Sequence, residues 1–183
     1  SNISVEPKSF LLVDAGGHYL EGTTDTTRTF AMGPLTDEQK KMYTAVLRGN
    51  LNLSHARFLK GCSGYNLDVI CRTPLWQIGM DYKHGTGHGV GYLLNVHEGP
   101  NTFRWKLPEG ANAAELEPGM VTTDEPGIYL EGKYGIRLEN ELLCVEGPKN
   151  EYGQFLEFEI LTLIPWDLDA VDPARMTEQE RTW

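Results

Sequence analysis

The sequence predicts an α+β domain in which a few helices accompany an antiparallel sheet. Two segments show the spacing of apolar residues that is typical of helices, at residues 36–59 and 66–78. Several short apolar runs, separated by glycine- and proline-rich turns, indicate strands. This combination favours the α+β class. The 183 residues suit one domain and are enough for a full hydrophobic core.

The first part of the chain should form a strand, a hairpin and a helix. The apolar run at residues 10–13 predicts a buried strand, and the glycine- and threonine-rich segment 14–30 predicts a hairpin or a loop between strands. Thr36 and Gln39 have the spacing of a capping box, so a helix should begin there and continue to about Leu59.

The middle of the chain should hold a second helix and a long irregular stretch. This helix should open at Asn66, and Pro74 should kink or split it, because proline interrupts the hydrogen bonds of a helix interior. Residues 84–95 are rich in glycine and predict a loop with a short strand, and residues 101–116 predict a surface loop.

The last part of the chain is expected to add strands and the beginning of a helix. The strands are expected at residues 120–124, 136–145 and 155–163. A second capping box at residues 177–180 predicts the start of the helix. Both ends of the chain interrupt a pattern, so we expect one partial domain over residues 1–183, in which residues 166–183 begin a truncated C-terminal extension.

Composition argues against several classes of partner. Asp and Glu number 26 against 16 Lys and Arg, which gives a net charge of −10 and makes nucleic acid a poor partner. No apolar run is long enough to span a membrane and no signal-peptide pattern is present, so we expect no membrane association and a cytoplasmic location. The three cysteines lack metal-site spacing and predict free thiols.

The first group of candidate residues is a pair of aspartates. A hairpin in segment 14–30 would bring Asp14 and Asp25 together. Its midpoint falls at residues 19–20, which are poor turn formers, so we expect a bulge. The alternative is that both aspartates are ordinary turn or capping residues.

The second group is a set of histidines. His84, His88 and His97 lie within 14 residues of one another, and the glycines between the first two would allow both to share one face of a strand and a ligand to approach closely. Histidine is a frequent metal ligand and proton carrier near neutral pH. The alternative is a polar loop with solvated histidines.

The third group is a pair of glutamates. Glu125 and Glu139 lie at equal distances from Gly132, which sits in good turn sequence, so a hairpin would place them nearly opposite each other. Opposed carboxylates need positive charge between them, and Arg137 shares the face of Glu139. The alternative is an exposed glutamate pair. Taken together, four carboxylates and one histidine form an oxygen and nitrogen ligand set suited to divalent ions.

The sequence around these residues resembles the pita-bread metallopeptidases, namely methionine aminopeptidase, prolidase and aminopeptidase P. The match runs from about residue 10 to 165, and stretches 84–91 and 94–100 are most similar to aminopeptidase P, the Xaa-Pro aminopeptidases. The resemblance implies a curved antiparallel sheet with helices on its outer face, truncated here at the N-terminus. We also expect a fragment of a longer enzyme, because members of the family carry further N-terminal segments.

The resemblance also implies a role for each candidate. Two divalent metal ions are implied, with Mn²⁺ expected first and Co²⁺, Zn²⁺ or Fe²⁺ as alternatives. Asp14 would bind one ion, Asp25 and Glu139 would bridge both, and His88 and Glu125 would bind the other. The implied catalytic groups are His84 and His97, which contact substrate and move protons, Glu125, which takes a proton from water, and Arg137, which orients its neighbours.

The implied reaction is hydrolysis that removes the N-terminal residue from peptides with proline at the second position. Proline-containing peptides are the implied partners, and the parent enzyme is implied to be a homodimer. We expect the fragment to bind metal but to hydrolyse weakly or not at all. The alternatives are prolidase or methionine aminopeptidase activity on the same fold, and a catalytically silent module that binds peptide or protein.

Overall fold

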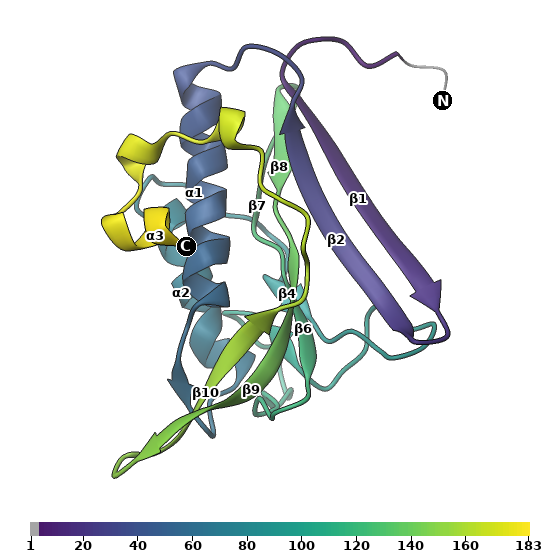
Figure 1. Cartoon of the computed structure of the whole chain (residues 1–183), viewed down its shortest axis with the longest axis vertical. Coiled ribbons are helices and arrows are strands. Elements are labelled where there is room, and N and C mark those ends of the chain that lie inside the picture. The colour runs from purple at the N-terminus through teal and green to yellow at the C-terminus, as the bar shows by residue number, and fades with distance from the viewer. Residues whose placement is uncertain (1–3) are drawn as a thin grey trace.

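The computed structural model describes residues 4–183 and confirms the α+β class (Figure 1). Its largest sheet is antiparallel, with strand order β3–β10–β9–β6. The strands of this sheet are β3 (Phe58–Leu59), β10 (Gly153–Ile160), β9 (Asn140–Asn150) and β6 (Val121–Asp124). Three further strand pairs, β1–β2, β4–β5 and β7–β8, are each antiparallel.

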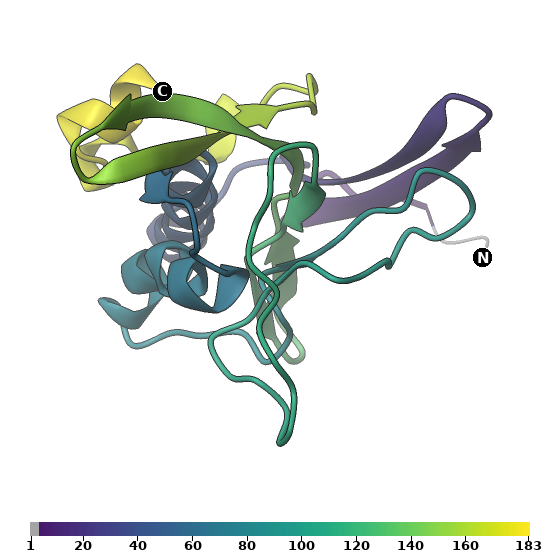
Figure 2. The ribbon, with the colours of Figure 1, turned by 90° about the horizontal axis from the view of Figure 1, so that it is seen from below.

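Two helices cover one side of the strands, and the β1–β2 hairpin leans away on the other side (Figure 2). Helix α1 (Asp37–Ser54) begins at the predicted capping box of Thr36 and Gln39. It ends before the predicted Leu59, because residues 58–59 pair with β10 as strand β3.

Helix α2 (Gly64–Trp76) opens slightly earlier than predicted and is capped by Ser63. Pro74 does not split this helix, which continues for two residues beyond it. The proline therefore lies in the last turn, where it marks the end of the helix rather than breaking its interior.

The predicted strand at residues 136–145 is two strands. Strand β6 pairs with β9, and strand β7 (Gly127–Leu130) pairs with β8 (Tyr134–Arg137). Both pairs keep the same register, so together they form one long hairpin that is interrupted on both arms. The interruption falls at residues 125–126 on one arm and 138–139 on the other.

The β1–β2 hairpin is regular. Strands β1 (Phe10–Tyr19) and β2 (Gly22–Ala31) pair without a register shift and turn at residues 20–21, so the predicted bulge is wrong. The prediction that β1 is buried is also wrong, since Val13 is 40% exposed. The hairpin packs little against the helices, because it extends away from them (Figure 1).

The remaining elements are short. Strand β4 (Gly87–His88) pairs with β5 (Thr102–Phe103), so the predicted surface loop at 101–116 is only partly exposed, and Phe103 and Leu116 are buried. The predicted C-terminal capping box is confirmed at α3 (Glu178–Thr182). Two 3₁₀ turns precede it, Leu168–Ala170 and Pro173–Arg175.

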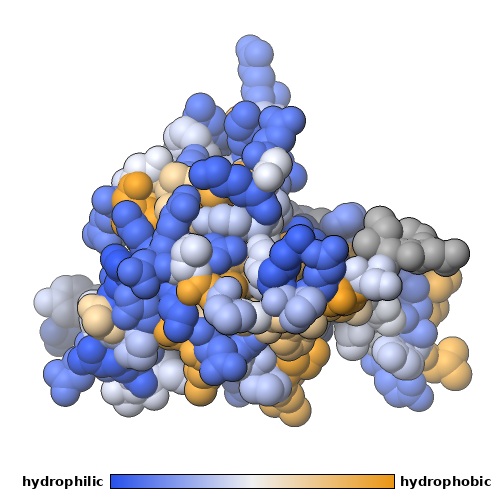
Figure 3. Space-filling model, turned by 90° about the horizontal axis from the view of Figure 1, so that it is seen from above, coloured by the Kyte–Doolittle hydropathy of each residue, from blue (hydrophilic) through white to orange (hydrophobic). Residues whose placement is uncertain are grey.

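The core consists of two apolar clusters. One joins α1 to the β7–β8 pair, and the other joins α2 to the main sheet. The face seen in Figure 3 is mostly hydrophilic, with apolar side chains in small separate groups. In the described part of the chain, no helix has both the length and the apolar composition needed to cross a bilayer. All three cysteines are free thiols, as expected.

Candidate metal centre

The β1–β2 hairpin places two carboxylates on one face. Asp14 is opposite Thr27, and Asp25 is opposite Gly16, so the aspartates lie one diagonal step apart rather than side by side. The side chain of Asp14 is 51% exposed. The hairpin therefore brings the pair together as predicted, although by a regular register and not through a bulge.

The interruption of the β6–β9 hairpin supplies the other two carboxylates. The shared register puts Glu125 directly opposite Glu139, as the position of Gly132 predicted. At the interruption the backbone N–H of Glu139 leaves its own hairpin and donates to the carbonyl oxygen of Thr27 on β2, at 3.0 Å. The hydroxyl of Thr27 also donates to Oε2 of Glu139 at 2.6 Å. These two hydrogen bonds join strand β2 of the first hairpin to the interrupted arm of the second hairpin.

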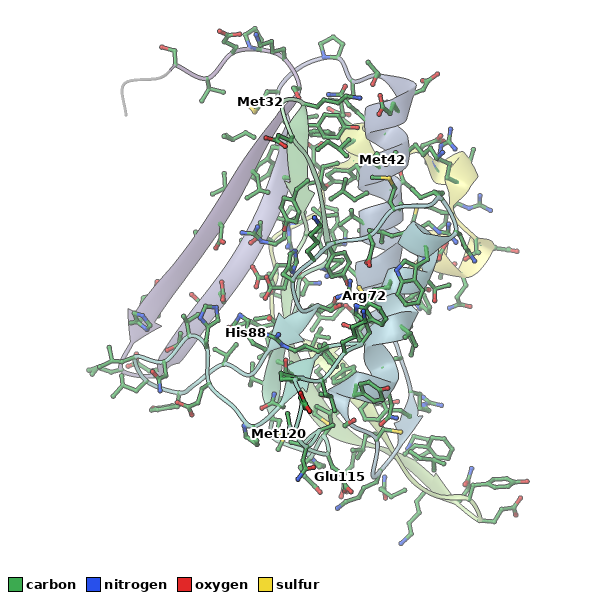
Figure 4. All side chains as sticks on the ribbon, turned by 180° about the vertical axis from the view of Figure 1, so that it is seen from behind. Met32, Met42, Arg72, His88, Glu115 and Met120 are labelled. Atoms are coloured by element: carbon green, nitrogen blue, oxygen red, sulfur yellow. The ribbon has the colours of Figure 1, made fainter. Side chains whose placement is uncertain are left out.

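His88 lies between the two pairs of carboxylates. Its Nε2 is 3.5 Å from Oδ2 of Asp25 and 3.3 Å from Oε1 of Glu125. Its backbone N–H donates to the hydroxyl of Thr123 at 3.0 Å, which ties β4 to β6. The ring lies on the side of the sheet that faces the β1–β2 hairpin (Figure 4).

All five predicted ligands line one cavity of about 290 Å³. They are Asp14, Asp25, His88, Glu125 and Glu139. His97 also lines this cavity, and its ring centroid is 4.2 Å from that of His88. The five side chains that the sequence analysis selected therefore come from five separate segments and converge on one space.

His84 stands in a neighbouring cavity of about 360 Å³. It precedes β4, so the prediction that His84 and His88 share one strand face is wrong. Nε2 of His84 is 2.9 Å from the hydroxyl of Tyr129, which accepts a hydrogen bond from Arg137 at 3.2 Å. Arg137 in turn forms an ion pair with Asp14. A chain of polar contacts therefore connects His84 to the first predicted metal ligand.

The charges of the site favour a cation. Burial and, to a smaller extent, the neighbouring carboxylate of Glu125 together raise the pKa of Glu139 to about 8. Burial lowers the pKa of His88, but its contacts with Asp25 and Glu125 outweigh this effect and raise the pKa to about 10. Carboxylates as close as these raise one another's pKa and stay protonated unless a positive charge lies between them.

Comparisons with known proteins agree with this geometry. Residues 1–146 match metallopeptidase family M24. The chain belongs to this family. Its fold is the pita-bread fold of the M24 metallopeptidases.

Three M24 relatives illustrate the similarity. A probable Xaa-Pro aminopeptidase P from Arthroderma gypseum is 46% identical over 98% of this chain. An X-prolyl aminopeptidase from Caenorhabditis elegans, described as a cytosolic enzyme with a di-nuclear active site, has a TM-score of 0.87 and 43% identity over 95% of this chain. An Xaa-Pro dipeptidase from Bacillus anthracis has a TM-score of 0.72 and 32% identity over 91% of this chain and 42% of its own. The chain spans 28% of the length of the first two relatives.

The donor set of this M24 chain fits divalent metal ions. Ligand atoms of Asp25, His88 and Glu139 all lie within 4.8 Å of one another. Carboxylate oxygens and an imidazole nitrogen are ligands of hard and borderline ions such as Mn²⁺, Co²⁺, Zn²⁺ and Fe²⁺. Glu125 and Asp14 line the same cavity, so the chemistry of its lining fits divalent metal ions.

Two residues that contact the predicted ligands or their backbone were missed by the sequence analysis. Oε1 of Glu141 accepts a hydrogen bond from the backbone N–H of Asp25 at 3.0 Å. The signal was available, because Glu141 lies two residues after Glu139 in a predicted strand and so shares its face. Arg28 is the other residue. It donates to the carbonyl oxygens of Glu139 and Ile164 and to Oδ1 of Asn140, contacts that no local pattern reveals.

Proposed function

We propose that this chain carries the metal centre of an Xaa-Pro aminopeptidase, which removes the N-terminal residue from peptides with proline at the second position. The observation that carries the proposal is the convergence of five predicted ligands on one cavity, with His97 beside them. The relative named as a probable Xaa-Pro aminopeptidase P at 46% identity supports this substrate class.

Two divalent ions are proposed for the site, with Mn²⁺ as the first candidate. When bound, such ions polarise a carbonyl oxygen and lower the pKa of water. The neighbour from Caenorhabditis elegans is described as having a di-nuclear active site, which supports the number of ions. The wording of that description also supports our proposal of a cytoplasmic location for this chain.

The residues of the chain would divide the work of hydrolysis. Glu125 accepts the proton of the attacking water and returns it to the proline nitrogen, which carries no proton of its own in the substrate. Its carboxylate is placed for this by Thr123, whose hydroxyl donates to Oε1 at 3.0 Å. His97 and His84 line the two adjoining cavities and would donate hydrogen bonds to the substrate carbonyl groups.

The proposal is tested by metal content and by cleavage specificity. We expect mass spectrometry to find about two divalent ions per chain after loading with Mn²⁺. Asp25→Ala and Glu139→Ala should each reduce this content strongly. The cleavage that the Mn²⁺-loaded chain retains is expected to be weak. It should be greater for an Xaa-Pro-Pro tripeptide than for Xaa-Pro dipeptides and Met-peptides, and Glu125→Gln should abolish it. A chain that retains no metal under these conditions would disprove the proposal.

Prolidase activity is the second candidate. It is favoured by the likeness to the Xaa-Pro dipeptidase of Bacillus anthracis, at a lower TM-score of 0.72. Preference for dipeptides in the same assay would favour prolidase activity.

A homodimer is the proposed assembly, and sedimentation of the metal-loaded chain measures it directly. Metal binding without cleavage of any proline peptide would fit both the expected inactive fragment and a silent peptide-binding module, and cleavage by the full-length protein distinguishes the two.

A further inference from the structure

The proposed chemistry leaves one buried charged cluster unexplained, and it lies behind the cavity of His84. Its centre is Arg72 on α2, whose side chain is 1% exposed. We propose that Arg72 is a positioning residue that fixes the loop of residues 81–86, and with it His84, at the edge of the metal centre. The role of His84 toward substrate rests on the proposed function, whereas the positioning of the loop does not.

The guanidinium group of Arg72 contacts three residues of this loop. Its Nη1 donates to Oδ1 of Asp81 at 2.7 Å and to the carbonyl oxygen of Tyr82 at 2.8 Å. Its Nη2 donates to the carbonyl oxygen of His84 at 2.8 Å. The guanidinium carbon also lies 3.9 Å from the centroid of the Tyr82 ring. One planar group therefore holds three points of a segment that has no regular secondary structure.

The position of Arg72 is itself fixed from the opposite side. Its Nε donates to Oδ1 of Asp68, one helical turn earlier, at 2.6 Å, and Asp68 is fully buried. The bond to Asp68 therefore orients the guanidinium group toward the loop. Figure 4 shows where Arg72 lies. Burying such a pair gives little net stability compared with apolar residues of the same volume. Here it satisfies backbone carbonyl groups of Tyr82 and His84 that would otherwise lack donors.

The loop transmits this fixation to two groups of the site. The Tyr82 ring packs on the His84 ring with centroids 4.8 Å apart. The Tyr82 hydroxyl is hydrogen-bonded to the hydroxyl of Thr86. The carbonyl oxygen of Thr86 then accepts the backbone N–H of Glu125 at 2.7 Å. Displacing the loop should therefore disturb His84 directly and the backbone at Glu125 through Thr86.

The test measures the loop itself in the full chain, so it does not depend on turnover. We compare Arg72→Met, which removes all donors, and Arg72→Lys, which keeps the charge but not the planar fork. Arg48→Met is the matched control, because Arg48 forms a partly buried ion pair with Glu180 on the far side of α1. Imidazole ¹⁵N signals of His84, assigned with His84→Gln, and amide hydrogen exchange are the two measurements.

We expect both Arg72 variants to shift the ring signals of His84. Exchange of the Thr86 and Glu125 amides should accelerate about tenfold or more, equivalent to about 1.4 kcal/mol of local opening free energy. The Glu139 amide, which bonds to Thr27, should not change. In Arg48→Met all these signals should stay as in the parent chain.

A purely structural role for Arg72 gives a different result. The Arg72 variants would then lower the melting temperature as Arg48→Met does, but leave the His84 signals and the Thr86 exchange unchanged, and this would overturn the proposal. If Arg72→Met fails to fold, Arg72→Lys decides alone. Failure of the proposed hydrolysis would leave these measurements unaffected, so the two proposals fail separately.

Discussion

The two hairpins that supply the carboxylates differ in how they are held. The β6–β9 hairpin, with its β7–β8 end, is part of the core, and Ile128, Ile136 and Leu138 are fully buried against α1. The β1–β2 hairpin leans away from the helices and exposes much of β1. One pair of carboxylates therefore stands on a hairpin that is packed into the core, while the other pair stands on a hairpin held by a few polar contacts at the site.

The polar contacts of the site also help to hold the β1–β2 hairpin in place. Thr27 accepts the Glu139 N–H, Glu141 accepts the Asp25 N–H, and Arg137 pairs with Asp14. Metal that binds across the two hairpins would add to this short list of contacts. We therefore expect metal binding and the docking of β1–β2 to be thermodynamically coupled.

The largest expected effect is a difference in the free energy of unfolding between substitutions in the two hairpins. Leu138→Ala should lower the free energy of unfolding by about 2–5 kcal/mol, because it leaves a cavity in the core. Val13→Ala on β1, which is 40% exposed, should change it by no more than about 0.5 kcal/mol. Urea unfolding followed by circular dichroism measures both. Similar losses for the two variants would show that β1 is covered in solution.

Metal should reduce the difference between the hairpins. At a free metal concentration of 100 times Kd, we expect a stabilisation of about 2.7 kcal/mol relative to the chelated chain. Hydrogen exchange should slow most in β2, and less in β9, which the core already protects. Asp25→Ala, the control, should remove both effects. Uniform protection of all strands would contradict the proposed coupling.

Acidity tests the buried pair of carboxylates. The pKa of Glu139 is raised from 4.5 to about 8, so between these values the folded chain binds more protons than the unfolded chain. The stability of the chelated chain should therefore fall as pH rises from about 4.5 to 8, by up to about 1.4 kcal/mol per pH unit. His88, with its pKa raised to about 10, acts with the same sign at higher pH. Urea titrations at several pH values measure the slope.

Glu139→Gln is the variant that assigns this pH dependence. It should reduce the slope below pH 8 in the presence of chelator, since the amide does not titrate. Part of the slope should remain, because burial also raises the pKa of Glu141, to about 7. An unchanged slope would mean that another group is responsible. Saturating Mn²⁺ should flatten the slope of the parent chain as well, because bound cations favour the ionised carboxylate.

The smallest expected effect comes from a single contact between the hairpins. Thr27→Val removes the hydroxyl that donates to Glu139 and accepts from Nε of Arg137, and it keeps the shape of the side chain. We expect a loss of about 1 kcal/mol in the free energy of unfolding. Metal affinity should also fall, because Glu139 loses its orientation. Thr26→Val, which changes the opposite face of the same strand, is the matched control. An equal loss of stability in both variants would show that the Thr27 hydroxyl contacts do not stabilise the chain.

The sequence predicted best what depends on neighbours along the chain. Capping boxes at Thr36 and Thr177 fixed two helix starts, and the turn at Gly132 fixed the register of Glu125 and Glu139. Each of these follows from contacts within about fifteen residues, where backbone geometry leaves few choices.

Contacts between distant segments explain the errors. Helix α1 ends at Ser54 because Phe58 pairs with Leu156, and the exposure of β1 depends on which elements cover it. The contact of Arg28 with Ile164 spans 136 residues and has no local signal. The roles proposed for the five cavity-lining residues came from the resemblance of short motifs, whereas their convergence depends on the tertiary fold.

The paired interruption in the long hairpin has a consequence for changes in chain length. Because both arms keep one register on either side of Glu125 and Glu139, extra residues inserted in the turn at 131–133 should leave the two carboxylates facing each other. One residue inserted in a single arm, between Glu125 and Leu130, would slide that arm and turn its side chains to the opposite face. The hairpin therefore tolerates lengthening at its tip and not along its sides.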